Sequence, residues 1–203
     1  MRTVTGLYDN YDDARAAVKA LEDAGVPSDE ISIVSNKGDG VKVEEQGNDA
    51  AEGAGTGAGI GAVAGGAGGL LAGLGMLAIP GVGPVVAAGW LAATAVGAVA
   101  GAVVGGAAGG IVGAMIKSGV PDEDANLYAE GVRRGGSVVA ARVEDDKQLV
   151  AQDILQRSRS VNIQERRALY SSEGWNRFDE SAQPYTASQI EEERLRFRND
   201  PRV

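Results

Sequence analysis

The sequence predicts an α+β fold, in which a split ferredoxin-like βαβ-βαβ domain is interrupted by a long glycine-zipper helical hairpin. Three observations predict this fold. Strand–helix–strand patterns occupy residues 1–36 and residues 137–166. Between them, no Asp, Glu, Lys or Arg occurs from residue 53 to residue 116. Within that charge-free stretch, glycine recurs at every fourth position, which places it on one side of a helix.

The first half of the domain, residues 1–36, reads as a strand, a helix and a second strand. Residues 3–7 (TVTGL) have strand character, and the following DNYDD supplies a turn and a helix cap. Gly25 ends the helix, and residues 31–34 (ISIV) form the second strand. Residues 37–52 are a polar connector. The helix buries the apolar positions that recur at intervals of three and four residues: Ala14, Ala17, Val18 and Leu21.

The second half, residues 137–166, repeats this pattern. Residues 137–143 (SVVAARV) form a strand, residues 144–146 open a helix, and residues 161–164 form the last strand. Neither half can close a core alone, so we expect a four-stranded antiparallel sheet with two helices on one face. The helix is expected to turn three side chains inward: Val150, Ile154 and Leu155.

Two further segments flank this half. Residues 118–136 predict an amphipathic connector helix, because acidic residues open it and Arg133 and Arg134 lie near its end, where they complement the helix dipole. The tail, residues 167–203, has a low density of apolar residues, which predicts disorder with a helical piece at residues 188–198. Its aromatic residues are candidates for docking on a partner or a neighbouring subunit: Tyr170, Trp175, Phe178 and Tyr185.

The glycines of the central stretch are candidate helix–helix contacts. In an isolated helix in water, each would cost about 1 kcal/mol relative to alanine. A helix face without side chains instead lets another backbone approach closely, which gains dispersion contacts and weak Cα–H···O bonds. The predicted packing interface consists of Gly53, Gly57, Gly61, Gly65, Gly69, Gly73, Gly89, Gly97, Gly101, Gly105, Gly109 and Gly113.

Residues 53–117 are predicted to form the helical hairpin. Residues 53–79 and 84–116 are each longer than the about 17–25 residues that cross a bilayer, and IPGVGP, at residues 79–84, supplies the turn. In lipid, an unpaired peptide group has no water to bond, so a glycine-rich segment there is held in a helix. Membrane insertion is therefore the first expectation. Glycine and alanine bury little apolar area, however. Two alternatives therefore stay open: a soluble helical assembly and a disordered glycine linker.

Composition argues against an enzyme and against a nucleic-acid partner. The chain has no histidine and no cysteine, so the usual general base, thiolate nucleophile and thiolate metal ligands are missing. A formal net charge of −9 offers no broad basic field for a nucleic-acid backbone. Gly59, Gly61 and Ala64 fit the dinucleotide fingerprint, but a chance match is expected in so glycine-rich a segment. We expect no catalytic residue, cofactor, metal or small-molecule substrate.

Two stretches resemble a known family. VTGLYDNYDDARAAVKALEDAGVPSDEISIVS, at residues 4–35, and GVPDEDANLYAEGVRRGGSVVAARV, at residues 119–143, are similar to the conserved parts of bacterial general stress protein 17M-like domains. A glycine-rich hydrophobic insertion between them is typical of these relatives, and the resemblance covers residues 2–166. It implies a stress-associated bacterial protein without an established catalytic activity, and no functional residue is carried over.

The sequence thus predicts a non-enzymatic general stress-response protein that forms homo-oligomers through its glycine-zipper hairpin. Both ends of the hairpin join halves of one domain and must lie on one side of a membrane; Lys117, Arg133 and Arg134 favour the cytoplasmic side. The expected location is the inner membrane, in contact with lipid, with the folded domain in the cytoplasm. The alternative is a soluble cytoplasmic ring, shell or filament with the hairpins as its internal helical core. A third hypothesis, a small-molecule sensor, needs a polar pocket.

Overall fold

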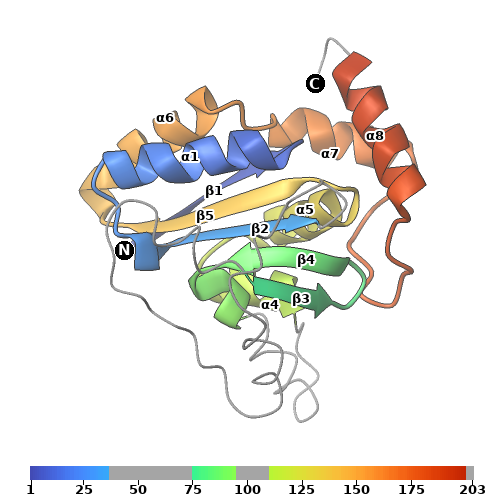
Figure 1. The fold of residues 1–203 in the computed structure, drawn as a ribbon, viewed down its shortest axis with the longest axis horizontal. Helices are drawn as coiled ribbons and strands as arrows, with labels where there is room; N and C mark the ends of the chain where they lie inside the picture. The colour runs from blue at the N-terminus through green and yellow to red at the C-terminus, as the bar shows by residue number, and fades with distance from the viewer. Residues whose placement is uncertain (37–74, 95–109, 200–203) are drawn as a thin grey trace.

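The computed structural model describes residues 1–36, 75–94 and 110–199 of the 203-residue chain. At its centre lies one antiparallel sheet with the strand order β1-β5-β2-β4-β3 (Figure 1). At this level the predicted mixture of helices with an antiparallel sheet is confirmed. The strands are β1 (Arg2–Tyr8), β2 (Ile31–Asn36), β3 (Gly75–Ile79), β4 (Gly83–Ala88) and β5 (Ser137–Val143).

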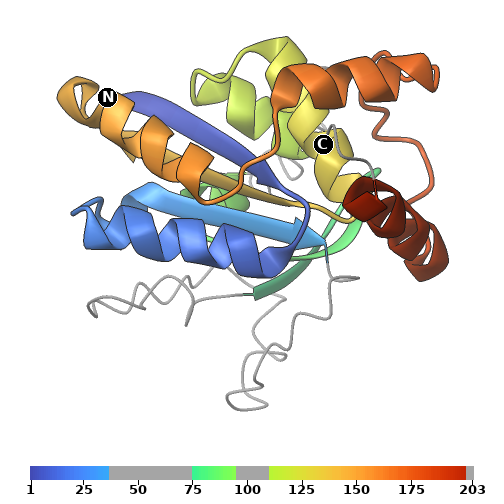
Figure 2. The same cartoon turned by 90° about the horizontal axis from the view of Figure 1, so that it is seen from above.

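Helices cover both faces of the sheet. Two of them, α1 and α6, pack against each other on one face over one apolar core, and Figure 2 shows them side by side. The other two, α4 and α5, cover the second core on the opposite face. Their bounds are α1 (Tyr11–Asp23), α4 (Gly110–Lys117), α5 (Asp122–Arg133) and α6 (Gln148–Arg157); the 3-10 turns η1 (Ser28–Glu30) and η5 (Asp145–Lys147) precede β2 and α6.

The helices of the first core follow from local sequence signals. Asn10 caps α1, because its side-chain oxygen accepts a hydrogen bond from the Asp13 backbone N–H at 2.8 Å. The predicted apolar stripe of α1 is confirmed: Ala14, Ala17, Val18 and Leu21 are all fully buried. On α6 the prediction holds for Leu155, which is buried, but is wrong for Val150, which is exposed to solvent.

The helical hairpin predicted across residues 53–117 is wrong at its centre. There the chain forms the antiparallel strands β3 and β4, and β4 pairs with β2. A short apolar run between turn residues fits a buried strand as well as a helix, and the β-branched Val85 and Val86 favour the strand. Neither predicted span, residues 53–79 or residues 84–116, is therefore one continuous helix.

Where it is described, the charge-free stretch supplies apolar core. Val85 on β4, Leu91 in the helical turn after it and Met115 on α4 are fully buried in the same cluster. No helix within the three described parts of the chain is long and apolar enough to cross a membrane. The rest of the two predicted spans, residues 53–74 and 95–109, lies outside the described residues, so insertion in the inner membrane stays a prediction.

The last strand, predicted at residues 161–164, is absent, because a helix begins there. α7 (Ile163–Ser172) follows Asn162, whose side-chain oxygen accepts hydrogen bonds from two backbone N–H groups of the first turn, at 3.1 and 3.4 Å. One backbone bond, from Val161 N to Leu7 O at 2.7 Å, ties this segment to the edge of β1. One expected strand is missing and two unexpected strands lie at the opposite edge, so the ferredoxin-like arrangement is not established.

The described part of the tail, residues 167–199, is folded, whereas the sequence predicts disorder for residues 167–203. α7 continues to Ser172, and α8 (Ala187–Asn199) contains the helical piece expected at residues 188–198. We call residues 173–199, from the end of α7 through α8, the strap. In Figure 1 the strap runs past one end of the β3–β4 hairpin before it forms α8.

Candidate functional site

Ten of the twelve predicted interface glycines lie outside the described residues, and the other two are Gly89 and Gly113. Gly89 directly follows β4 with a φ of +89°, and a Cβ there would lie 2.2 Å from Ile31 O. It therefore allows a close crossing over β2 and makes no helix–helix contact, so this prediction is wrong. Gly113 lies half-buried in α4. For the remaining glycines the packing interface stays a prediction.

The strap crosses the turn between β3 and β4, within the IPGVGP sequence. A Cβ at Gly81 would lie 2.7 Å from Asp179 O, and one at Gly83 would lie 2.8 Å from the Pro184 side chain. Phe178 is buried beside them, in the core that α4 and α5 cover. Because Gly81 also has a φ of +73°, only glycine fits between the turn and the strap without strain.

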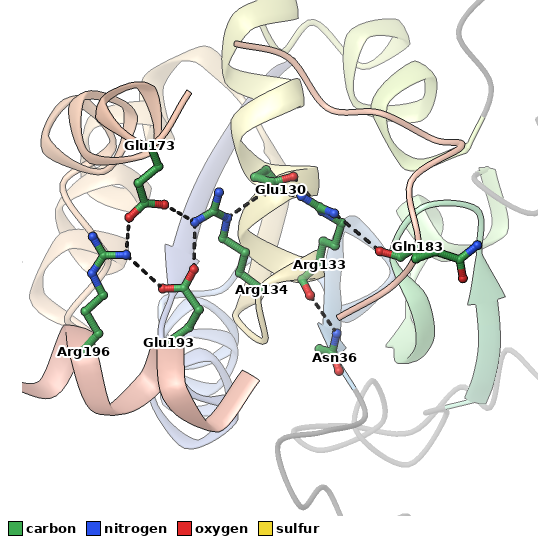
Figure 3. A network of polar contacts seen from close by, with 8 residues as sticks. All are labelled: Asn36, Glu130, Arg133, Arg134, Glu173, Gln183, Glu193 and Arg196. Carbon is green, nitrogen blue, oxygen red and sulfur yellow. Dashed lines mark hydrogen bonds and ion pairs between the residues drawn. The ribbon is translucent and has the colours of Figure 1, made fainter. Parts of the chain in front are cut away.

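A cluster of charges at the end of α5 forms the second attachment of the strap (Figure 3). Arg134 Nε donates to Glu130 Oε1 at 2.7 Å, and Arg134 Nη1 donates to Glu173 Oε2 at 2.6 Å and to Glu193 Oε1 at 2.8 Å. Arg196 closes a ring by pairing with Glu173 and, at 3.8 Å, with Glu193. Arg134, directly after α5, thus holds carboxylates from both ends of the strap.

Arg133 extends the cluster toward the sheet and the middle of the strap. Its Nε and Nη2 donate to the two carboxylate oxygens of Glu130 at 2.8 and 2.7 Å, and its Nη1 donates to Gln183 O at 3.5 Å. Asn36, the last residue of β2, donates to Val132 O at 3.0 Å. The end of α5 therefore joins the sheet on one side to the strap on the other.

Charge pairing compensates for burial in this cluster. Glu130 is fully buried and Arg134 nearly so. Desolvation alone would lower the pKa of Arg134, but its bonds to Glu130 and Glu173 raise that pKa above the usual value. Desolvation alone would raise the pKa of Glu173, yet hydrogen bonds from Arg134 and Arg196 lower it below the usual 4.5. Removal of one partner would leave a buried charge uncompensated, which is strongly destabilising.

Aromatic rings flank the arginines that hold the tail. The Arg134 guanidinium lies 4.0 Å from the centre of the Tyr170 ring, and the Arg166 guanidinium lies 3.7 Å from the centre of the Phe197 ring. Such cation–π contacts strengthen when water is excluded. Desolvation raises the pKa of the buried Tyr170 to about 12. Tyr170 and Phe178, which the sequence offered as residues for a partner, are buried within this chain.

An open cavity of about 420 Å³ lies on the sheet face that α4 covers, and Thr3, Trp90, Ser118 and Arg142 line part of it. Its polar groups already serve the fold: Thr3 Oγ1 donates to Ser118 O at 2.6 Å, and Arg142 Nε donates to Glu30 Oε2 at 2.5 Å. Within the described residues, no cluster of acidic side chains is placed to hold a metal ion. These bonds within the fold thus add no specific support for a small-molecule sensor.

Residues 3–82 match the family model described as the heat-induced stress protein YflT domain. This match confirms the predicted relation to the general stress protein family. The search of curated proteins and the search of solved structures give no match.

The YflT match includes β1, α1, β2 and β3 and ends within the turn that the strap crosses. In the sheet, however, β5 lies between β1 and β2, and it comes from outside the match. The matched strands β1 and β2 are therefore joined by a strand that lies more than fifty residues beyond the match. The resemblance of residues 119–143 to the same family stays a prediction.

Sequence reasoning missed the strap. The sequence analysis identifies Arg133 and Arg134 as the charged end of a connector helix and as a signal for the cytoplasmic side, not as attachment points for the tail. Two carboxylate partners of Arg134 lie 39 and 59 residues further along the chain, where nothing in the local pattern points back to α5. The available signal was the group of aromatic residues in a polar tail, because such residues rarely stay exposed without a packing partner.

Proposed function

We propose that this chain is a non-enzymatic general stress-response protein that self-associates through its two glycine-rich segments. The YflT match supports the stress-response role, because the family model describes a heat-induced stress protein domain. The matched residues include 53–73, the first of the two segments. The four-residue glycine spacing supports self-association, because helices with one face free of side chains gain contact energy when they pack closely. The lack of histidine and cysteine supports a role without catalysis.

The placement of the described residues around these segments supports the proposal. In the sequence, the first segment lies between β2, which ends at Asn36, and β3, which begins at Gly75; the second lies between Thr94 and α4, which begins at Gly110. β2 and β3 lie on the two sides of β4 in the sheet. The apolar cluster that contains side chains of β4 also contains side chains of α4. Both glycine-rich segments thus begin and end around one strand. Their high local concentration favours pairing, within one chain or between copies.

Of the two settings expected for the assembly, we favour the soluble cytoplasmic one. Val85 and Met115, which lie in the predicted spans, are fully buried in the domain core, so they offer no surface to lipid. Under this proposal the expressed protein remains in the supernatant as an oligomer after high-speed sedimentation. Recovery only with membranes, and release only by detergent, would support the membrane setting instead.

The ferredoxin-like arrangement also stays a proposal. The neighbouring order β1-β5-β2, with antiparallel pairing and α1 and α6 on one face, suits three of its four strands. The bond from Val161 N to Leu7 O marks the edge at which the fourth strand would pair. A homologue with a strand in that position would support a common ancestry with such domains.

Leucine substitution of a register glycine tests the self-association. In Gly65→Leu and Gly105→Leu, a bulky side chain blocks close helix packing, so the mass measured by light scattering should fall to that of a smaller oligomer or a monomer. Val63→Leu and Val103→Leu, two positions from the register, are matched controls that should keep the wild-type mass. A wild-type mass in both glycine variants would contradict the proposal.

A stress role predicts a response to heating in the source cells. The amount of this protein should rise after a temperature step, as the description of the YflT family implies for its members. Quantitative mass spectrometry of cells before and after the step measures the rise, with a constitutive protein as control. A constant amount through several stresses would contradict this part of the proposal.

A further inference from the structure

The open cavity beside α4 carries positive charge in a chain whose formal net charge is −9. Lys117, at the end of α4, and Arg142, on β5, both line it, and no Asp or Glu is among the described residues of its lining. Arg142 is the cross-strand partner of Thr3 on β1. Thr3 Oγ1 donates to the carbonyl of Ser118 at 2.6 Å, which brings the end of α4, with Lys117, to the same place.

Arg142 is held in position by contacts that leave its terminal nitrogens available. Its Nε donates to Glu30 Oε2 at 2.5 Å, and its guanidinium lies 4.8 Å from the centre of the Trp90 ring. Within the described parts of the chain, neither the Nη atoms of Arg142 nor Nζ of Lys117 forms a hydrogen bond or an ion pair. A guanidinium fixed in this way is suited to a phosphate group, whose oxygens accept paired hydrogen bonds from arginine.

The hydroxyl groups of the lining indicate what the rest of a ligand must offer. Each of the three donates its proton to a backbone carbonyl: Thr3 Oγ1 to Ser118 O at 2.6 Å, Thr94 Oγ1 to Trp90 O at 2.7 Å, and Ser118 Oγ to Ala114 O at 2.8 Å. A hydroxyl that has donated its proton can only accept further hydrogen bonds. These groups therefore do not bind an anion, but their oxygens accept from the hydroxyl groups of a ligand.

We propose that this cavity binds a phosphorylated sugar or polyol. The phosphate binds Lys117 and the Nη atoms of Arg142, and the ligand's hydroxyl groups donate to the threonine and serine oxygens. The cavity volume of about 420 Å³ lies within the range of about 300–1,000 Å³ found for ligand sites. The same chemistry occurs in free sugar phosphates and in the headgroup of phosphatidylglycerol. This inference goes beyond the proposed function and does not depend on self-association.

The first test uses Trp90 as a reporter in the full chain. The chain has two tryptophans, so Trp175→Phe leaves Trp90, in the cavity lining, as the single fluorophore. The probes are glucose 6-phosphate and glycerol 3-phosphate, with glucose, glycerol and inorganic phosphate as controls. The Kd of at least one probe should be about tenfold or more below that of every control, because only the probes offer both a phosphate and hydroxyl donors. Equal binding of inorganic phosphate, or no saturable binding of either probe, overturns the proposal.

The second test removes one charge from the cavity. Lys117→Gln should raise the Kd of the bound probe about tenfold, because a charge-assisted hydrogen bond to the phosphate is lost. Lys19→Gln is the matched control: it removes the same charge from α1, on the other face of the sheet, and should change the Kd by less than about twofold. Circular dichroism checks that both variants keep the fold. Equal Kd values in the two variants would place the binding elsewhere and overturn the site.

Vesicle sedimentation distinguishes the two sources of the ligand. If the ligand is a lipid headgroup, the protein sediments with phosphatidylglycerol vesicles and not with phosphatidylcholine vesicles, and both glycerol 3-phosphate and Lys117→Gln reduce the sedimented fraction. If the ligand is a free metabolite, the protein binds the soluble probes and stays in the supernatant with either vesicle. Sedimentation that neither glycerol 3-phosphate nor Lys117→Gln reduces, without binding of the soluble probes, overturns the proposal and leaves the proposed self-association untouched.

Discussion

α1 and α8 are helices of equal length, 13 residues each, but they are attached to the protein in different ways. α1 buries four apolar side chains at helical spacing, all fully inaccessible to solvent. α8 buries Ile190 and Phe197 and is otherwise held by ion pairs to Arg134 and Glu173 and by a hydrogen bond from Arg194 to Gly135 O. The first kind of attachment belongs to the core of the fold, and we expect the second to open while that core stays intact.

The largest effect is expected when each helix loses one buried apolar side chain. Leu21→Ala in α1 should lower the free energy of unfolding by about 3 kcal/mol, through lost burial and a residual cavity. Ile190→Ala in α8 should lower the global value much less, because the strap can detach before the core unfolds. Denaturant unfolding followed by circular dichroism measures both. Equal losses would mean that α8 is part of the cooperative core.

Substitutions in the charge cluster should cause the second-largest loss in the free energy of unfolding. Arg134→Met leaves the buried Glu130 with Arg133 alone and removes the partner of two strap carboxylates, so we expect a loss of about 2–4 kcal/mol. The matched control is Arg157→Met, because Arg157 is 80% exposed and forms an ion pair with Asp153 on its own helix. Its loss should stay within about 0.5 kcal/mol. Thermal unfolding of both variants provides the comparison.

A smaller effect separates backbone strain from contact with the strap. Gly81 and Gly25 both have positive φ, at +73° and +83°, but a Cβ meets Asp179 O only at Gly81; at Gly25 nothing lies within 4 Å. Gly25→Ala should therefore cost about 1 kcal/mol from strain, and Gly81→Ala about 1 kcal/mol more. Only Gly81→Ala should speed trypsin cleavage of the strap. Equal behaviour of the two variants would contradict the strap contact.

The smallest effect is expected from mild acid. Because the folded state lowers the pKa of Glu173, this carboxylate stabilises the docked strap above pH 4.5, and the contribution is lost as the pH falls through the lowered value. Acidification should thus shift the indole N–H resonance of Trp175, which lies in the strap, before that of Trp90 in the core region. Glu173→Gln should remove the early shift. Simultaneous shifts of both indoles would show that the strap has no separate transition.

The contrast between α1 and α8 also explains how far the sequence predicted the fold. β1, α1, β2, α5 and β5 carry their periodicity and caps within a few residues, so they were predicted with small errors at their ends. β3 and β4 were mistaken for helices, because a five- or six-residue apolar run has no diagnostic period. The strand expected at residues 161–164 failed because Asn162 caps a helix there.

The candidate site was the least predictable part. Arg134 and the turn glycines Gly81 and Gly83 were visible in the sequence, but their meaning depends on the strap, which approaches from far along the chain. A polar helix held by ion pairs has no apolar stripe, and hydrophobic patterning therefore does not detect it. Long-range charge pairing of this kind becomes visible only in three dimensions.

Native-state hydrogen exchange of the full chain tests the central claim most directly, because it measures the opening free energy of α1 and α8 in one experiment. The amides of α8 should exchange through a local opening, at a free energy well below that of α1 and nearly independent of low denaturant concentrations. The α1 amides should exchange only by global unfolding. Equal protection of both helices, with the same denaturant dependence, would contradict the claim that the strap is a separately releasable element.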